Sequence, residues 1–183
     1  MKLILLDGGP ASGKNTLGAL LARKLQDHGN KATLLDLDTY VEHLNSTWIW
    51  NDKAKEENDQ QNARANFAEA IDNYLRQKYI VIAIGERFLT KENIANFIGR
   101  LKTSPSVYLY HLSIPFSMRM ERLHKRGPHS LIDLAKDQKD RDSNLKWYGY
   151  IYKNVNSEST DTQNLFQLIQ DDKGLLKLKL FNK

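Results

Sequence analysis

Apolar and polar positions along the chain fall into blocks of two kinds. Short apolar runs bounded by charged or turn residues predict strands, and the longer segments between them, in which apolar residues recur every three or four positions, predict helices. The predicted strands are residues 2–6, 32–38, 79–85, 106–112 and 148–154. The predicted helices are residues 14–27, 54–77 and 91–101, the segment from Pro115 to Gly127, residues 130–147, and a last helix that is capped by Thr160 or Asp161 and ends near Gln170.

This alternation of strands and helices favours right-handed crossovers and a parallel sheet with helices on both faces. We therefore expect an α/β fold with a five-stranded parallel sheet. Residues 39–53 carry two tryptophans and show little periodicity, so no regular element is predicted there. The tail, residues 171–183, contains the alternating run "LLKLKLF". That run is compatible with an added edge strand, but we expect a strand-like extension packed on the surface.

Length and composition favour one globular domain over residues 1–183, because the chain is 40% hydrophobic and 27% charged and shows no repeat or linker. No apolar run approaches the roughly 18–20 residues that span a membrane, so no membrane contact is expected. The absence of cysteine excludes disulfides and thiol nucleophiles and fits a cytoplasmic location. The net charge of +5 favours a polyanionic partner. Because the basic residues are mostly dispersed, we expect a nucleoside triphosphate and no nucleic acid.

The stretch "GGPASGKNT" lies between the first predicted strand and the first predicted helix. A glycine-rich turn in this context predicts an anion site, since backbone N–H groups converge on the phosphates and the helix dipole adds positive charge. Lys14 is placed to reach the β- and γ-phosphates, so we predict that this loop binds ATP. The residues predicted to bind it are Gly8, Gly9, Pro10, Ala11, Ser12, Gly13, Lys14, Asn15 and Thr16.

Asn15 departs from the usual phosphate-loop pattern, in which a hydroxyl follows the lysine and contacts Mg²⁺. The run "GKNT" resembles the G-K-G-T of adenylate kinases and their relatives. The resemblance implies that Mg²⁺ is the metal and that Thr16 supplies the hydroxyl on its side, directly or through water. Asn15 offers a neutral oxygen, so both residues are candidate metal ligands.

Most of the chain resembles the phosphate-loop (P-loop) kinases that act on nucleoside monophosphates, nucleosides and other small hydroxyl compounds, although no single family is matched throughout. The stretch "VYLYHLSIPFSMRMERLHKRG" is similar to their strand, helix and lid passage, and "IYKNVNSESTDTQNLFQLI" to their last strand, turn and closing helix. "IAIGERF" resembles the [DE]-R-[SYF] motif of deoxynucleoside and thymidylate kinases. The resemblance implies a three-layer P-loop fold with a short basic lid at about residues 126–142. It also implies transfer of the γ-phosphate of ATP to a small acceptor.

Three arginines follow the fourth predicted strand at helical spacing: Arg119, Arg122 and Arg126. Residues three and four apart lie on one side of a helix, so these guanidinium groups can converge on one point. Alone, the pattern is typical of a solvated basic face. After a phosphate loop it favours a clamp on the charge of the transferring phosphate, with Arg122 and Arg126 as catalytic residues beside Lys14.

Two aspartates end the second predicted strand, at the edge where open α/β sheets bind ligands. "DLDTY" resembles the D-G-D of adenylylsulfate and gluconate kinases and the D-x-[FY]-Y of uridine kinase-like enzymes. The resemblance implies that such a carboxylate contacts the acceptor or its metal. We expect Asp38 to act as a catalytic general base and Asp36 to lie at the substrate or at a water-bridged metal. The other predicted substrate residues are Tyr40, Trp48, Arg64, Glu86 and Arg87.

The sequence leaves the acceptor open between two classes. The pair Glu86 and Arg87 favours a nucleoside or nucleotide, whereas the segment from Asp36 to Tyr40 suits a non-nucleotide hydroxyl compound such as a sugar acid, an adenylylsulfate-like compound or an antibiotic. An ATP-binding protein without turnover is a further alternative, which Asn15 does not decide. Small kinases of this kind are often dimers, so a homodimer is one expected assembly.

Overall fold

The computed structural model describes residues 1–125, 133–144 and 146–181. Five parallel strands form one sheet in the order β2-β3-β1-β4-β5, which confirms the predicted sheet. The strands are β1 (Lys2–Asp7), β2 (Ala32–Asp36), β3 (Ile80–Ile84), β4 (Ser106–Ser113) and β5 (Tyr150–Lys153). Because all five strands run in one direction, their carboxyl ends meet at one edge of the sheet.

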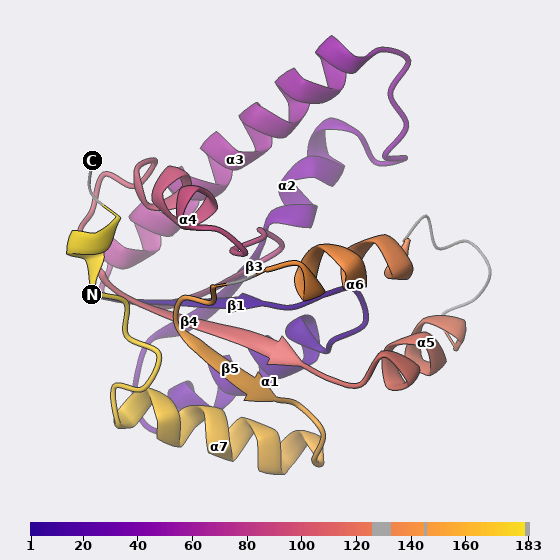
Figure 1. Cartoon of the computed structure of the whole chain (residues 1–183). Coiled ribbons are helices and arrows are strands. Elements are labelled where there is room, and N and C mark those ends of the chain that lie inside the picture. The colour runs from indigo at the N-terminus through magenta and orange to yellow at the C-terminus, as the bar shows by residue number, and fades with distance from the viewer. Residues whose placement is uncertain (126–132, 145, 182–183) are drawn as a thin grey trace.

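Helices cover both faces of this sheet, so the fold has the three layers expected (Figure 1). Helices α1 and α7 lie on one face, and α3 and α4 lie on the other. The helices are α1 (Lys14–Asp27), α2 (Leu37–Leu44), α3 (Lys53–Arg76), α4 (Lys91–Ile98), α5 (Phe116–His124), α6 (Leu134–Asp142), α7 (Glu158–Gln170) and the short 3₁₀ helix η1 (Leu178–Leu180).

The central strand β1 divides the hydrophobic core in two. Leu3 and Leu5 pack toward α3 and α4, whereas Ile4 and Leu6 pack toward α1 and α7. All four side chains are fully buried. Burial on both faces is why this strand is apolar without alternation, as parallel central strands are.

The structure corrects the predicted end of the second strand. β2 ends at Asp36, and residues 37–44, for which no regular element was predicted after residue 38, form α2. The cause is a cap: the Asp36 side chain accepts a hydrogen bond from the backbone N–H of Asp38 at 3.1 Å and so starts the helix. Asp38 therefore lies in the first turn of α2 and not on the strand.

The predicted cap of the last helix is also wrong. Ser157 caps α7, because its hydroxyl accepts from the backbone N–H of Thr160 at 3.2 Å. Asp161 is fully buried inside the first turn, where its carboxylate accepts from Asn156 N at 3.0 Å and from the Tyr152 hydroxyl at 2.5 Å. Asp161 thus fixes the turn between β5 and α7 instead of starting the helix.

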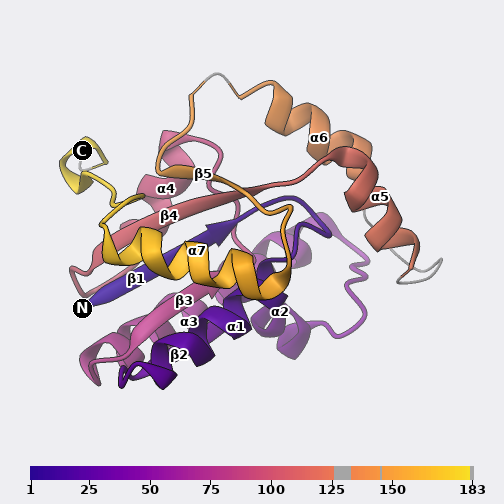
Figure 2. The same ribbon diagram turned by 90° about the horizontal axis from the view of Figure 1, so that it is seen from below.

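The tail packs beside the first half of β4, which β5 does not reach, in keeping with the expected extension (Figure 2). Leu109 N donates to Gly174 O at 3.0 Å, and Leu176 N donates to Val107 O at 2.8 Å. These bonds flank a single antiparallel bridge and form no further strand through residue 181. Within the described part of the chain, no helix has the length and apolar character needed to cross a membrane.

A buried carboxylate on α3 fixes the loop between α4 and β4. Asp72 is 1% exposed and accepts from Lys102 N at 2.7 Å, from Thr103 N at 3.0 Å and from the Thr103 hydroxyl at 2.5 Å. Burial by itself would raise the pKa of Asp72, but these hydrogen bonds outweigh it and lower the pKa.

We predict that Asp72→Ala lowers the free energy of unfolding by about 2–4 kcal/mol at neutral pH, because three donors lose their acceptor. Urea titration measures this difference. Since the folded-state pKa is lowered, the carboxylate stabilises the fold above about pH 4, and the difference from the wild type shrinks as the pH falls further. Glu69→Ala, an exposed site on the same helix, should change the free energy by less than about 0.5 kcal/mol. Equal losses in the two variants would contradict the prediction.

Candidate active site

Residues 8–13 form a tight turn between β1 and α1. Ala11 and Gly13 have positive φ angles of 60° and 93°, and Ser12 N donates to Gly9 O at 3.1 Å. Gly13 is the N-cap of α1, and no side chain of the described residues caps it. The N–H groups of the first helical turn therefore stay available to an anion, as a phosphate loop requires.

Lys14 folds back over this turn. Its ammonium donates to Gly8 O at 2.7 Å and to Gly9 O at 3.2 Å. Burial lowers the pKa of Lys14, whereas the carboxylates of Asp7 and Asp38 act in the opposite direction. A nucleotide phosphate would replace these two carbonyl contacts with stronger ones, in which both donor and acceptor are charged.

Side chains from α5 and from the residue after β5 hold the outer side of the turn. Arg119 is 3% exposed, and its hydrogen bond to the loop is shorter than that of Arg122. The sequence pattern favoured Arg122 over Arg119. Arg126, the other predicted clamp residue, lies outside the described residues. The three contacts are Arg119 Nε to Pro10 O (3.0 Å), Arg122 Nη1 to Ala11 O (3.4 Å) and Asn154 Nδ2 to Ser12 O (2.7 Å).

Helix α6, which falls within the predicted lid, lies directly on the glycine loop. A Cβ atom at position 9 would meet Asp137 Oδ2 and Arg119 Nη2, so a larger residue there would require these two side chains to move. Of the predicted lid, the structure describes residues 133–142. Three basic and three acidic side chains alternate along α6, so this helix is balanced in charge.

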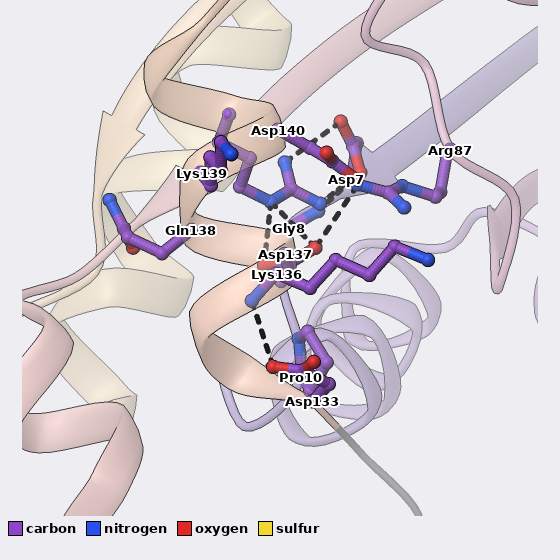
Figure 3. A network of polar contacts seen from close by, with 12 residues as sticks. Asp7, Gly8, Pro10, Arg87, Asp133, Lys136, Asp137, Gln138, Lys139 and Asp140 are labelled. Atoms are coloured by element: carbon purple, nitrogen blue, oxygen red, sulfur yellow. Dashed lines mark hydrogen bonds and ion pairs between the residues drawn. The ribbon is translucent and has the colours of Figure 1, made fainter.

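Asp137 is the centre of the contact between α6 and its surroundings (Figure 3). Its carboxylate accepts from Arg119 Nη2 at 2.5 Å, from Arg141 Nε at 3.1 Å and from Arg87 Nη2 at 3.4 Å. These arginines belong to α5, to α6 and to the loop after β3. Arg87, predicted as a substrate residue, also reaches Asp140 at 3.3 Å and therefore lies against the lid.

A second buried carboxylate ends β1, directly before the glycine loop. Asp7 accepts from Gly8 N at 2.7 Å, from His111 Nδ1 at 2.8 Å, and from Arg141 Nη1 and Nη2 at 3.3 and 3.1 Å. Burial by itself would raise the pKa of Asp7, but the hydrogen bond from His111 and the charge of Arg141 hold it well below its ordinary value. Arg141 thus joins the sheet to the lid through two carboxylates.

Sequence reasoning did not select Asp7, His111 or Asp137, and it placed Arg141 only in the lid region. Asp7 and His111 carried a usable signal, because each is a polar residue near the end of an apolar strand and the parallel register sets them opposite each other. No local pattern points to Asp137, whose partners Arg119 and Arg87 lie 18 and 50 residues away along the chain.

Two predicted acceptor residues lie on the other side of the glycine loop, at the end of β2. Asn15 Nδ2 donates to Asp36 Oδ2 at 2.8 Å, so the loop contacts the residue that caps α2. Burial and, after it, the charge of Asp36 raise the pKa of Asp38 to about 6, although Lys14 acts in the opposite direction. Asp38 keeps an exposed surface, so an acceptor can reach it.

Glu86 and Arg64, both predicted substrate residues, form an ion pair near the end of β3. Arg64 Nε lies 3.0 Å from Glu86 Oε2, and the side chains are 30% and 14% exposed. Arg64 Nη1 also donates to Gln60 O at 3.2 Å. The structure therefore places Glu86 with α3 and Arg87 with α6, although the two residues are adjacent in sequence.

The predicted aromatic residues shape the region where α2 and α3 meet. The ring of Tyr40 packs edge-on against Phe67 at a centroid distance of 5.4 Å. Trp48 packs edge-on against Trp50 at 6.3 Å, and Trp50 Nε1 donates to Asp59 Oδ2 at 2.8 Å. Tyr40 and Trp48 are each partly exposed, so they combine packing with a surface that a ligand can contact.

The residues on the acceptor side of the loop fit a magnesium ion held together with a nucleotide. Among residues 1–125, 133–144 and 146–181, no group of three or more His, Cys, Asp or Glu side chains is placed to hold a metal ion. Mg²⁺ in kinases needs few protein ligands, because phosphate oxygens and water complete its shell. The hydroxyl of Thr16 is exposed at the start of α1, and Asp36 lies across from Asn15, so these oxygens fit such an ion.

A family model described as "Chromatin associated protein KTI12" matches residues 1–85. This segment runs from β1 through the end of β3 and includes the glycine loop and the acceptor side. A comparison with curated proteins gave no match.

Solved structures of P-loop kinases resemble nearly the whole chain. Shikimate kinase from Aquifex aeolicus is 16% identical, with a TM-score of 0.60 over 94% of this chain and 98% of that one. APS kinase from Mycobacterium tuberculosis, in complex with AMPPNP and APS, is 14% identical, with a TM-score of 0.61 over 92% and 97%. A sugar kinase from Janibacter sp. HTCC2649 is 14% identical, with a TM-score of 0.62 over 100% and 99%. The chain has the fold of the P-loop kinases.

We predict that Arg141→Met lowers the free energy of unfolding by about 3–5 kcal/mol, because Asp7 and Asp137 both lose a buried partner. Thermal and urea unfolding measure the change. Asp7→Asn combined with Arg141→Met should recover part of the loss, since one uncompensated charge is then absent. Arg100→Met removes an exposed arginine and should leave stability within about 0.5 kcal/mol. A double variant as unstable as the single one would argue against the ion pair.

Proposed function

We propose that the protein is an ATP-dependent phosphotransferase that moves the γ-phosphate of ATP to a hydroxyl group of a small acceptor, which is a nucleoside or nucleotide. One observation carries the proposal: Asn15, the neighbour of Lys14 in the glycine loop, donates at 2.8 Å to Asp36, and Asp36 caps the turn that carries Asp38. A phosphate-binding cation beside a carboxylate of raised pKa is the pairing that phosphoryl transfer to a hydroxyl needs.

Each group has a defined part in the reaction. The loop N–H groups and Lys14 bind the phosphates, and Arg119 and Arg122 hold the loop from outside. The acceptor oxygen forms a bond to the γ-phosphorus while the bond to the β,γ-bridging oxygen breaks, and ADP leaves. Asp38 accepts the hydroxyl proton, because its pKa of about 6 leaves it ionised yet basic at neutral pH. Mg²⁺, when bound, neutralises phosphate charge.

Glu86 supports a nucleoside or nucleotide acceptor. Arg64 holds its carboxylate in one orientation near the carboxyl end of β3, so it can accept hydrogen bonds from a sugar hydroxyl or a base N–H group. The exposed parts of Tyr40 and Trp48 can contact a flat base. A non-nucleotide hydroxyl compound is the second candidate, supported by the fold likeness to kinases named for shikimate, APS and sugars.

The experiment that tests the proposal is ADP release from ATP and Mg²⁺ across a panel of nucleosides, nucleoside monophosphates, sugars, sugar acids and hydroxylated antibiotics. Turnover with one acceptor class that is lost in Lys14→Ala would support the proposal and choose between the two candidates. ATP binding without turnover on any acceptor would indicate an ATP-binding protein instead. No ATP binding at all would overturn the proposal.

We predict that Asp38→Asn lowers kcat by about 10²–10⁴-fold, because the variant lacks the proton acceptor. In the wild type, kcat should rise with pH through about 6 and then level off, since Asp38 must be ionised. Asp36→Asn keeps an oxygen that can cap α2 but removes a neighbouring negative charge, so the rising part of its profile should move to lower pH. The measurement is kcat against pH with the acceptor identified by the panel. An unchanged profile in Asp38→Asn would exclude this carboxylate as the base.

A further inference from the structure

The carboxylate of Asp137 is surrounded by arginines in a way that matches a bound phosphate. Its two oxygens face guanidinium groups from three separate segments, and Figure 3 shows Arg87 and Asp137 converging above the start of the glycine loop. The Asp137 side chain is 10% exposed, and those of Arg119 and Arg141 are 4% and 11% exposed. Several arginines converging on one anion is the arrangement by which proteins bind phosphate groups.

The charges around Asp137 favour a bound anion. Lys14 and three arginines gather here. The opposing carboxylates are Asp7, which is bound to Arg141, Asp140, which contacts Arg87 from an exposed position, and Asp38, which acts on Lys14. Without Asp137, the positive charges of the arginines would repel one another more strongly. The negative charge of a polyphosphate would offset that repulsion.

This carboxylate lies against the glycine loop. Asp137 Oδ2 fills the space that a side chain at Gly9 would need, so the carboxylate touches the loop backbone. A pocket of about 370 Å³ opens beside it, and Gly9, Arg119 and Arg141 line that pocket. An anion can therefore approach two of the guanidinium groups without first separating α6 from the sheet.

We propose that Asp137 is an internal substitute for a phosphate group: it occupies an anion site formed by Arg87, Arg119 and Arg141 above Gly9, and a polyphosphate ligand displaces it. The inference rests on the proposed function, because it assigns a regulation to the same phosphate site. In the protein without ligand, the Asp137 carboxylate holds α6 against the glycine loop and reduces the repulsion between the arginines. Ligand affinity is reduced by the free energy needed to displace the carboxylate.

The test is calorimetric binding of inorganic tripolyphosphate at fixed salt concentration by the wild type, Asp137→Asn, Asp137→Glu and Asp140→Asn. Asp137→Asn should bind tripolyphosphate about tenfold or more tightly than the wild type, since the competing charge is gone. Asp137→Glu keeps that charge and should bind within about threefold of the wild type. Asp140→Asn is the matched control, because Asp140 lies on the same helix but contacts only Arg87 of the three arginines among the described residues.

Folded Asp137→Asn that binds tripolyphosphate no more tightly than the wild type would overturn the proposal. If Asp137→Asn does not fold, NMR of the wild type decides: saturation with tripolyphosphate should shift the Nε–Hε signals of Arg119 and Arg141 and the carboxyl carbon of Asp137, and unchanged signals would overturn it. If neither the wild type nor any variant binds tripolyphosphate, both this proposal and the proposed ATP site would be overturned. If the acceptor panel shows turnover but Asp137→Asn binds tripolyphosphate more weakly than the wild type, this proposal would be overturned and the proposed function would stand.

Discussion

The guanidinium of Arg141 joins two buried carboxylates that belong to different layers of the molecule. Asp7 ends the central strand and bonds the first N–H of the glycine loop, while Asp137 belongs to the lid helix. Burial by itself would lower the pKa of Arg141, but the two carboxylates outweigh it and raise the pKa, so the positive charge is fixed. Such a cluster contributes little net stability compared with apolar packing, yet it allows few alternative arrangements. The position of α6 on the loop depends on it.

The two sides of the glycine loop differ in charge, because the arginines on one side are paired with Asp7 and Asp137. Arg119 and Arg141 lie on the β4 side of the loop, whereas Asp36 and Asp38 lie on the β2 side. Lys14 stands between them. The carboxylates on the β2 side repel a polyphosphate, so its negative charge would be directed toward Lys14 and the arginines.

The sequence predicts the parts of this structure that depend on local pattern. Strand positions, the glycine loop and the long helix α3 follow from runs and periods, and parallel pairing follows from their order. The helix α2 escapes prediction, because it starts from the cap at Asp36 and has only two buried residues, Leu37 and Val41. The contacts of α6 are not predicted from the sequence for another reason. Arg141 meets Asp7 across 134 residues of chain, and such pairings leave no local trace.

The unusual Asn15 acquires a physical meaning from its contact with Asp36. A carboxylate can only accept hydrogen bonds, so a residue facing it must supply a donor, and the amide of Asn15 does so while its oxygen stays free. The side chain of serine, usual at this position in phosphate loops, is shorter than that of asparagine. Asp36 also accepts a hydrogen bond from the backbone N–H of Asp38. Asn15 is therefore linked through this one carboxylate to the start of α2. These two hydrogen bonds thereby hold the glycine loop and the turn that carries Asp38 in a fixed relation.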